Sequence, residues 1–230
     1  MTPISTFIST VTIIGTGIFI LMASAAMVSH AATQLPPKER DVQWYLYALI
    51  GLWFSLAMIP AVSGQLSFPL LAPYALLPIV LGTALTFYTP IKNLFRNIPT
   101  HWLIFLQVYR VAGAIFLYHY YVDGLLTRGF AINAGFGDMI TGLLAIPVGF
   151  MILRKTRGHQ LALILWTIFG IGDLIVAPAS AVIFGNDGLA LFPISFVPLF
   201  LGPPFGILIH IIALRNFWLQ SKKSTTAIKM

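Results

Sequence analysis

Charged residues are scarce in this chain of 230 residues, since Asp, Glu, Lys and Arg together make up only 8% of it. Soluble domains average about 25%. Cysteine is absent, which excludes disulfides and cysteine-ligated zinc or iron–sulfur sites. Apolar residues reach 58%. The net charge of +7 does not indicate a nucleic-acid partner, because the basic residues lie in short loops between apolar runs. We expect lipid, not water, to be the main solvent.

The apolar residues fall into seven runs, each near the length of about 20 residues that crosses a bilayer. The runs cover residues 8–31, 43–62, 69–91, 101–122, 130–153, 160–184 and 192–216. Short loops separate them, and no linker is long enough to divide two domains. The sequence predicts an all-α, seven-helix transmembrane bundle that forms one domain over residues 1–230.

The basic residues predict the direction of the spans. With the N-terminus outside and the C-terminus in the cytoplasm, only Arg128 among the loop residues is outside, an asymmetry that favours this orientation. The eleven basic residues on the cytoplasmic side are Lys38, Arg40, Lys92, Arg96, Arg154, Lys155, Arg157, Arg215, Lys222, Lys223 and Lys229.

Three ionisable residues lie inside the predicted spans, where a charge costs several kcal/mol and marks a functional candidate. They are Arg110 in span four, Asp138 in span five and Asp173 in span six. At about 1.5 Å per residue, all three lie near the midplane. We expect these spans to pack around an Arg110–Asp138–Asp173 cluster, with Gln107 and Tyr109 as neighbouring binding candidates. With all three ionised, one carboxylate is left to bind a proton, a cation or a cationic ligand group. The alternative is an ionic lock that only fixes packing.

The two aspartates share a local pattern, Gly135-Phe-Gly-Asp138 and Gly170-Ile-Gly-Asp173. An inverted pair of this kind is typical of transporters. The pattern also resembles the signature of presenilin-type intramembrane aspartyl proteases, which implies a proton-sharing pair of aspartates. Against that reading, the Tyr-Asp and Pro-Ala-Leu elements of the family are missing, and Arg110 would keep both carboxylates ionised.

Histidines supply the only cofactor hypothesis. Haem would bind through His210, the deepest, with His101 or His30 as a second ligand, although an interfacial histidine more often faces solvent. We predict no bound cofactor and no metal site. The spans contain no lysine, which excludes a retinal Schiff base. Prolines within the spans predict kinks, the strongest at Gly202-Pro-Pro204.

Residues 105 to 215 resemble a family of uncharacterised bacterial membrane proteins. The matching residues are Gln107, Tyr109, Arg110, Ala134, Gly135, Gly137, Asp138 and Asp173. No activity is established for that family, so the resemblance implies a multi-pass protein of the bacterial inner (plasma) membrane and no particular chemistry.

Three functional readings follow. The first is a small-solute or ion transporter, or a channel-like protein, that uses the charged cluster. The second is a structural or accessory subunit of a membrane assembly, with a protein partner or a second copy of the chain. The third is an intramembrane enzyme or a haem-binding electron carrier. The expected partners are the lipid bilayer and a small solute, cation or proton, and the residues favour a role other than catalysis.

Overall fold

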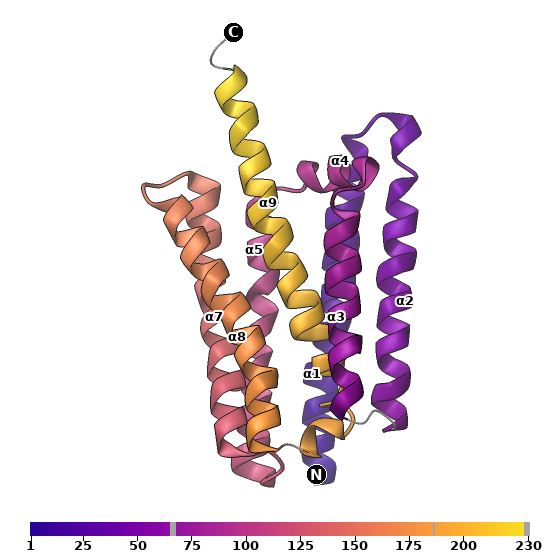
Figure 1. Ribbon diagram of the computed structural model, residues 1–230, viewed down its shortest axis with the longest axis vertical. Coiled ribbons are helices and arrows are strands. Elements are labelled where there is room, and N and C mark those ends of the chain that lie inside the picture. The colour runs from indigo at the N-terminus through magenta and orange to yellow at the C-terminus, as the bar shows by residue number, and fades with distance from the viewer. Residues whose placement is uncertain (65–67, 186, 228–230) are drawn as a thin grey trace.

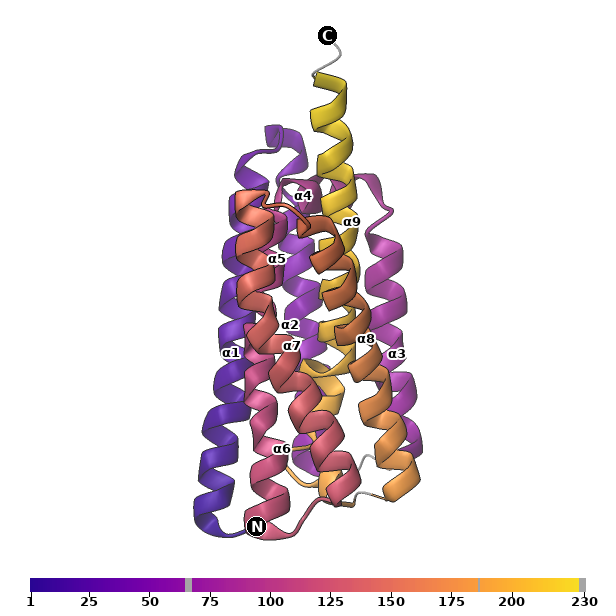
Figure 2. The same ribbon diagram turned by 90° about the vertical axis from the view of Figure 1, so that its left-hand side faces the viewer.

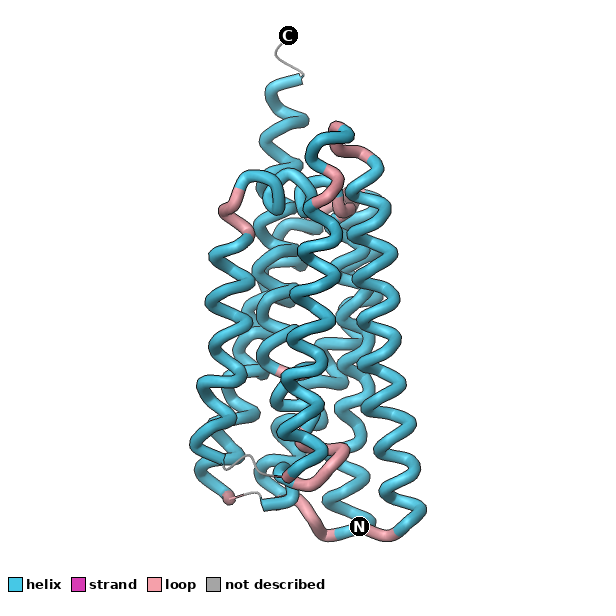
Figure 3. The backbone as a smooth tube through the Cα atoms, turned by 90° about the vertical axis from the view of Figure 1, so that its right-hand side faces the viewer, coloured by secondary structure: helices cyan, strands magenta, loops and turns pink. Residues whose placement is uncertain are grey.

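The computed structural model describes residues 1–64, 68–185 and 187–227, and within these ranges the chain is helical without a strand (Figures 1 and 3). Six of its helices are long and apolar enough to cross a membrane, or seven if one bent pair counts as a span. The predicted all-α architecture is thus confirmed, with six to seven candidate spans.

The elements follow one another with short connections. They are α1 (Pro3–Thr33), η1 (Pro37–Glu39), α2 (Val42–Ser63), α3 (Phe68–Leu85), α4 (Thr89–Asn97), α5 (Thr100–Leu106), η2 (Gln107–Gly113), α6 (Ala114–Tyr118), η3 (His119–Asp123), α7 (Arg128–Arg154), α8 (His159–Phe184), η4 (Asp187–Ala190), η5 (Val197–Leu201) and α9 (Pro203–Ala227).

The third predicted span, 69–91, is too long. Helix α3 ends at Leu85, and the chain bends by 91° into α4. Pro90 explains the boundary, since it has no N–H to donate to the preceding turn of α3 but suits the first turn of a new helix. Helix α4 buries Ile91 and Leu94 while carrying Lys92 and Arg96. An amphipathic helix of this kind is suited to lie in a membrane interface.

The predicted break in the last span is present, but the span begins later than expected. In place of one helix over 192–216, a single turn of π-helix, η5, ends at Leu201, and α9 starts at Pro203. Neither Pro203 nor Pro204 has an N–H to donate to the preceding turn, so the helix cannot continue through them. Pro147 and Pro178, by contrast, lie inside the continuous helices α7 and α8.

The fourth span is continuous from Thr100 to Asp123 but is not a uniform α-helix. Its middle part, η2, is a tighter 3₁₀ segment from Gln107 to Gly113 that contains Arg110. A 3₁₀ stretch in the middle of a helix often marks a site of strain or function.

The spans form one bundle in which α9 runs between two groups of helices (Figures 1 and 2). Span four, α7 and α8 lie on one side of it, and α1, α2 and α3 on the other (Figure 1). Two apolar cores fill the bundle. One core, which includes Leu94 and Ala213, lies towards the C-terminal end, and the other, which includes Ile13 and Phe130, lies towards the N-terminal end. Arg110 lies between Leu106 of the first core and Ile115 of the second.

The basic connections gather at one end of the bundle. Segments η1 and α4 and the α7–α8 connection lie at the end from which the C-terminus emerges, whereas the α6–α7 connection beside Arg128 lies at the N-terminal end (Figure 1). Lys229 is outside the described residues. Most basic residues thus lie at one end of the bundle, as the predicted orientation requires. The orientation itself stays a prediction.

Candidate functional site

The candidate site is centred on Arg110, a residue that is 2% exposed. Its Nε donates to Asp138 Oδ1 at 2.6 Å, and its Nη2 donates to Asp173 Oδ2. Its Nη1 donates to the carbonyl oxygen of Gly170 at 3.1 Å. The expected cluster of spans four to six is therefore present, and each guanidinium nitrogen has an acceptor.

Glycines permit the close packing of these spans. A Cβ atom on Gly113 would overlap the Asp138 side chain, and a Cβ atom on Gly137 would overlap the Asp173 carboxylate. Small residues at such positions let transmembrane helices approach each other closely. Gly172 differs, because a Cβ atom there would meet nothing within 4 Å. The two Gly-x-Gly-Asp copies are thus packed differently despite their similar sequence.

The two carboxylates bind separate nitrogens of one guanidinium. A proton-sharing pair of the aspartyl-protease type instead needs two carboxyl groups that cannot both ionise. The positive charge of Arg110 between them removes that constraint, so the geometry does not favour the protease reading.

Gln107 and Tyr109 bond to the broken seventh span. The Gln107 side-chain amide donates to the carbonyl oxygen of Gly206 at 2.9 Å, and the Tyr109 hydroxyl donates to that of Leu201 at 2.6 Å. Both therefore hold the segments on either side of Gly202 against span four. They act next to the cluster, as positioning residues for the break.

His210 joins the charged layer, which the sequence analysis did not anticipate. Its Nε2 lies 3.5 Å from Arg110 Nη1, and its ring centroid lies 4.3 Å from that of Trp166. Counting back from Gln220, where the last span ends, places His210 ten residues in, just as Arg110 is ten residues from Thr100. Among the described residues, its Nδ1 has no hydrogen-bond partner.

The other two haem candidates lie elsewhere. The rings of His30 and His101 both lie near Trp102, with centroid distances of 4.8 and 6.3 Å. The ring of His210 lies instead against Trp166 and Arg110. In the part of the chain that the structure describes, no group of three or more His, Cys, Asp or Glu residues is placed to hold a metal ion.

A small hollow reaches the cluster from beside α1. Its volume is about 20 Å³, and the residues around it include Thr16, Tyr109, Gly113, Asp138 and Gly202. A cavity of about 10–15 Å³ is enough for one water molecule. The hollow therefore accommodates about one water or a small ion next to Asp138, and no larger molecule.

A second polar cluster ties α1 to the end of span four. His119 is fully buried, with Nδ1 2.8 Å from Asp123 Oδ2 and Nε2 2.6 Å from Ser9 Oγ. Ser5 Oγ donates to Asp123 Oδ1 at 2.8 Å. His119 is not among the site residues that the sequence predicted. Its i,i+4 spacing to Asp123 was the available signal. The order of groups matches a Ser-His-Asp triad, but Ser9 is fully buried, and we assign this cluster to packing.

Replacing Ser9 with alanine is expected to destabilise the protein by about 1–3 kcal/mol, because a buried imidazole nitrogen loses its partner. The free energy of unfolding in detergent micelles measures this loss. Ser55→Ala is the matched control, since the Ser55 hydroxyl is exposed and bonds to the Gly51 carbonyl oxygen of its own helix. Equal stability of the two variants would contradict the assignment.

The long apolar helices and the buried charges at one depth define a polytopic helical membrane protein. The chain belongs to the family described as a domain of unknown function (DUF8737), whose model matches residues 67–218. The match includes α3 and α4, and so begins earlier than the resemblance over 105–215. It contains the whole charged cluster and excludes α1 and α2. No curated protein sequence and no solved structure matches the chain.

Proposed function

We propose that this protein is an ion transporter or a channel-like protein whose working site is the Arg110–Asp138–Asp173 cluster. The observation that carries the proposal is the ratio of charges, since one buried guanidinium faces two carboxylates. If all three ionise, the site has an excess of one negative charge. A proton or one small cation would neutralise it, and a group that gains and loses such a charge is suited to drive transport.

The size of the hollow beside Asp138 limits the cargo. A volume of about 20 Å³ admits a proton carried by water, or a small cation, and leaves no room for an organic solute. Of the small-solute and ion readings, the geometry therefore favours the ion.

The break in the seventh span forms one wall of the hollow. Val197, Leu201 and Gly202 line the hollow opposite Asp138. Transporters commonly build their ion sites at discontinuous helices, where the backbone is less constrained than in a continuous helix. Tyr109 and Gln107 bond to backbone carbonyl oxygens on either side of this break.

Asp138→Asn and Asp173→Asn are each expected to reduce proton or cation flux at least tenfold, because a neutral amide does not bind the transported charge. Flux into proteoliposomes, followed with a pH-sensitive or cation-sensitive dye, measures the effect. Asp41→Asn, which changes an exposed residue at the start of α2, is the control and should transport normally. Unaltered flux in both cluster variants would refute the proposal.

A structural or accessory role is the second candidate, and the bonds of Arg110 to two neighbouring helices favour it. The guanidinium bonds to α7 through Asp138 and to α8 through Asp173 and Gly170, and it lies against His210 of α9. Such a lock fixes packing without transport. Under this reading, the two asparagine variants lose thermal stability or a co-purifying membrane partner, and the wild type shows no flux above empty liposomes.

A further inference from the structure

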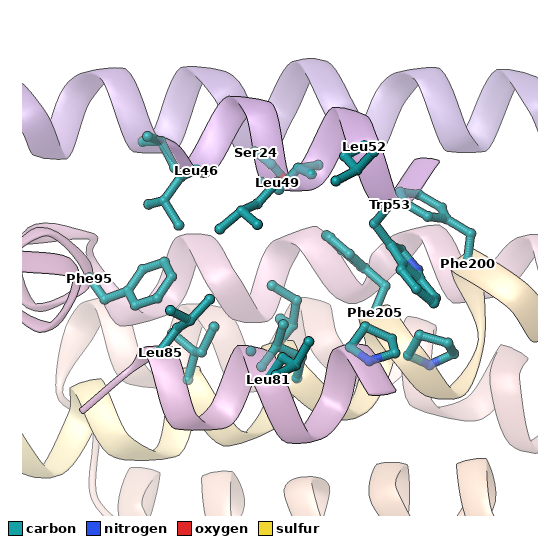
Figure 4. Close-up of a pocket in the computed structure, with 18 of the residues that line it drawn as sticks. Ser24, Leu46, Leu49, Leu52, Trp53, Leu81, Leu85, Phe95, Phe200 and Phe205 are labelled. Atoms are coloured by element: carbon teal, nitrogen blue, oxygen red, sulfur yellow. The ribbon is translucent and has the colours of Figure 1, made fainter. Parts of the chain in front are cut away.

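An apolar cavity of about 280 Å³ lies between α1, α2, α3 and α9 (Figure 4). Its walls are almost entirely apolar. Residues drawn around it include Leu46, Leu49, Leu52, Leu81, Leu85, Phe95, Phe200 and Phe205. Its volume is near the lower end, about 300 Å³, of the range for small-molecule sites.

The cavity opens sideways towards the bilayer. Leu49 and Leu52 of α2 are 42% and 56% exposed, and Leu77 and Leu81 of α3 are 57% and 53% exposed. All four line the cavity. At the N-terminal end of the gap, the rings of Trp53 and Tyr74 lie 6.1 Å apart between their centroids. A molecule dissolved in the membrane would thus enter between α2 and α3.

Two polar groups in the wall lack partners. Ser24 Oγ and Trp53 Nε1 are buried, and neither has a hydrogen-bond partner among the described residues. Both residues line the cavity, and Ser24 is 6% exposed (Figure 4). A buried donor without an acceptor is costly, so such groups usually have a partner in the functional state. Each of these two groups donates a hydrogen bond, and the indole N–H does nothing else.

We propose that this cavity binds a bilayer-dissolved molecule that has an apolar body and a carbonyl oxygen, which accepts hydrogen bonds from Ser24 and Trp53. The apolar lining selects the body, and the two donors select the carbonyl. Because the volume is small and the opening is lateral, only part of the molecule is enclosed, and its tail stays in the lipid. A quinone ring and an acyl ester both present this chemistry. The inference goes beyond the proposed ion transport and does not depend on it.

The broken seventh span separates the two sites. Phe200, Pro204 and Phe205 face the apolar cavity, whereas Leu201 and Gly202 line the hollow beside Asp138. A ligand in the cavity is therefore kept from Arg110 by this segment. Binding and ion flux can be tested separately, and either can fail alone.

The test uses a radiolabelled benzoquinone with a decyl tail as the probe, bound to the purified full-length protein in detergent micelles. Ser24→Ala and Trp53→Phe are each expected to weaken binding about three- to tenfold, the effect of one neutral hydrogen bond. Ser55→Ala and Trp44→Phe are the matched controls, because both residues are exposed on α2 and neither lines the cavity. The controls should bind as the wild type does.

A second variant tests the space itself. Leu81→Trp places a larger side chain at the opening and is expected to reduce binding more than tenfold, whereas Leu165→Trp, at a 58% exposed position on α8, should have no effect. Both sites are exposed, so we expect both variants to fold, and circular dichroism checks this.

Competition identifies the source of the carbonyl. Displacement of the probe by unlabelled quinone but not by a diacylglycerol supports the proposal with a quinone ligand, and displacement by the diacylglycerol supports it with an acyl ester. Displacement by hexadecane as effective as that by either carbonyl compound would overturn carbonyl recognition. Equal binding by the wild type, Ser24→Ala, Trp53→Phe and Leu81→Trp would overturn the site altogether.

Discussion

An Arg110→Met protein is expected to unfold with a free energy about 3–5 kcal/mol below that of the wild type. Removing one partner of a buried ion pair leaves an uncompensated charge, and here two carboxylates lose the same partner. The linear methionine side chain keeps much of the apolar volume of arginine. The decrease in the free energy of unfolding therefore measures the effect of removing the charge. Reversible unfolding in mixed micelles, followed by circular dichroism, measures the difference.

The matched control removes the charges together. In the triple variant Arg110→Met, Asp138→Asn, Asp173→Asn, no ion is left buried, so most of the lost stability should return, as it does when whole buried ion networks are neutralised. If the triple variant were as unstable as Arg110→Met alone, packing and not charge would explain the loss. A change below about 1 kcal/mol in Arg110→Met would contradict the buried cluster itself.

Gly137→Ala is expected to have the second largest effect, a loss of about 1–3 kcal/mol or more. Its new methyl group would occupy the position of the Asp173 carboxylate, so either α7 and α8 must separate or Asp173 must leave Arg110. Overpacking a tight contact typically costs this much. The same variant should also impair ion flux under the proposed function, because it displaces a member of the cluster.

Gly172→Ala is the control for that experiment. Gly172 has the same place before Asp173 as Gly137 has before Asp138, yet an added Cβ would meet nothing within 4 Å. In a helix interior, alanine is favoured over glycine by about 0.5–1 kcal/mol. Gly172→Ala should therefore be neutral or slightly stabilising. An equal loss of stability in the two variants would show that the overlap with Asp173 does not explain the effect of Gly137→Ala.

The ionic lock and the ion site are compatible roles for one cluster. An arginine that ties α7, α8 and α9 together determines where the two carboxylates sit, and a fixed pair of carboxylates is what a selective ion site requires. The asparagine variants report on both roles, since a loss of thermal stability measures the lock and a loss of flux measures the ion site.

Much of this architecture follows from hydropathy and spacing. Lipid forces the backbone to satisfy its own hydrogen bonds, so a run of about 20 apolar residues has few alternatives to a helix. The depth of Arg110, Asp138 and Asp173 follows from counting residues, and their high cost in lipid made their pairing predictable. The break at Gly202 follows from two adjacent prolines, whose missing N–H groups no neighbouring sequence can restore.

Counting residues along a span does not predict contacts between distant parts of the chain. His210 is 100 residues from Arg110, and Ser9 is 110 residues from His119, so their meeting depends on the rotation and tilt of whole helices. Helix packing also decides that Gly137 contacts Asp173 while Gly172 has open space beside it, although both glycines stand in the same local motif. The apolar cavity between α2 and α3 has no local signature either, because each leucine there looks like any lipid-facing leucine. Local patterns determine which segments enter the membrane and at what depth. The packing of several helices at once determines which side chains share a site.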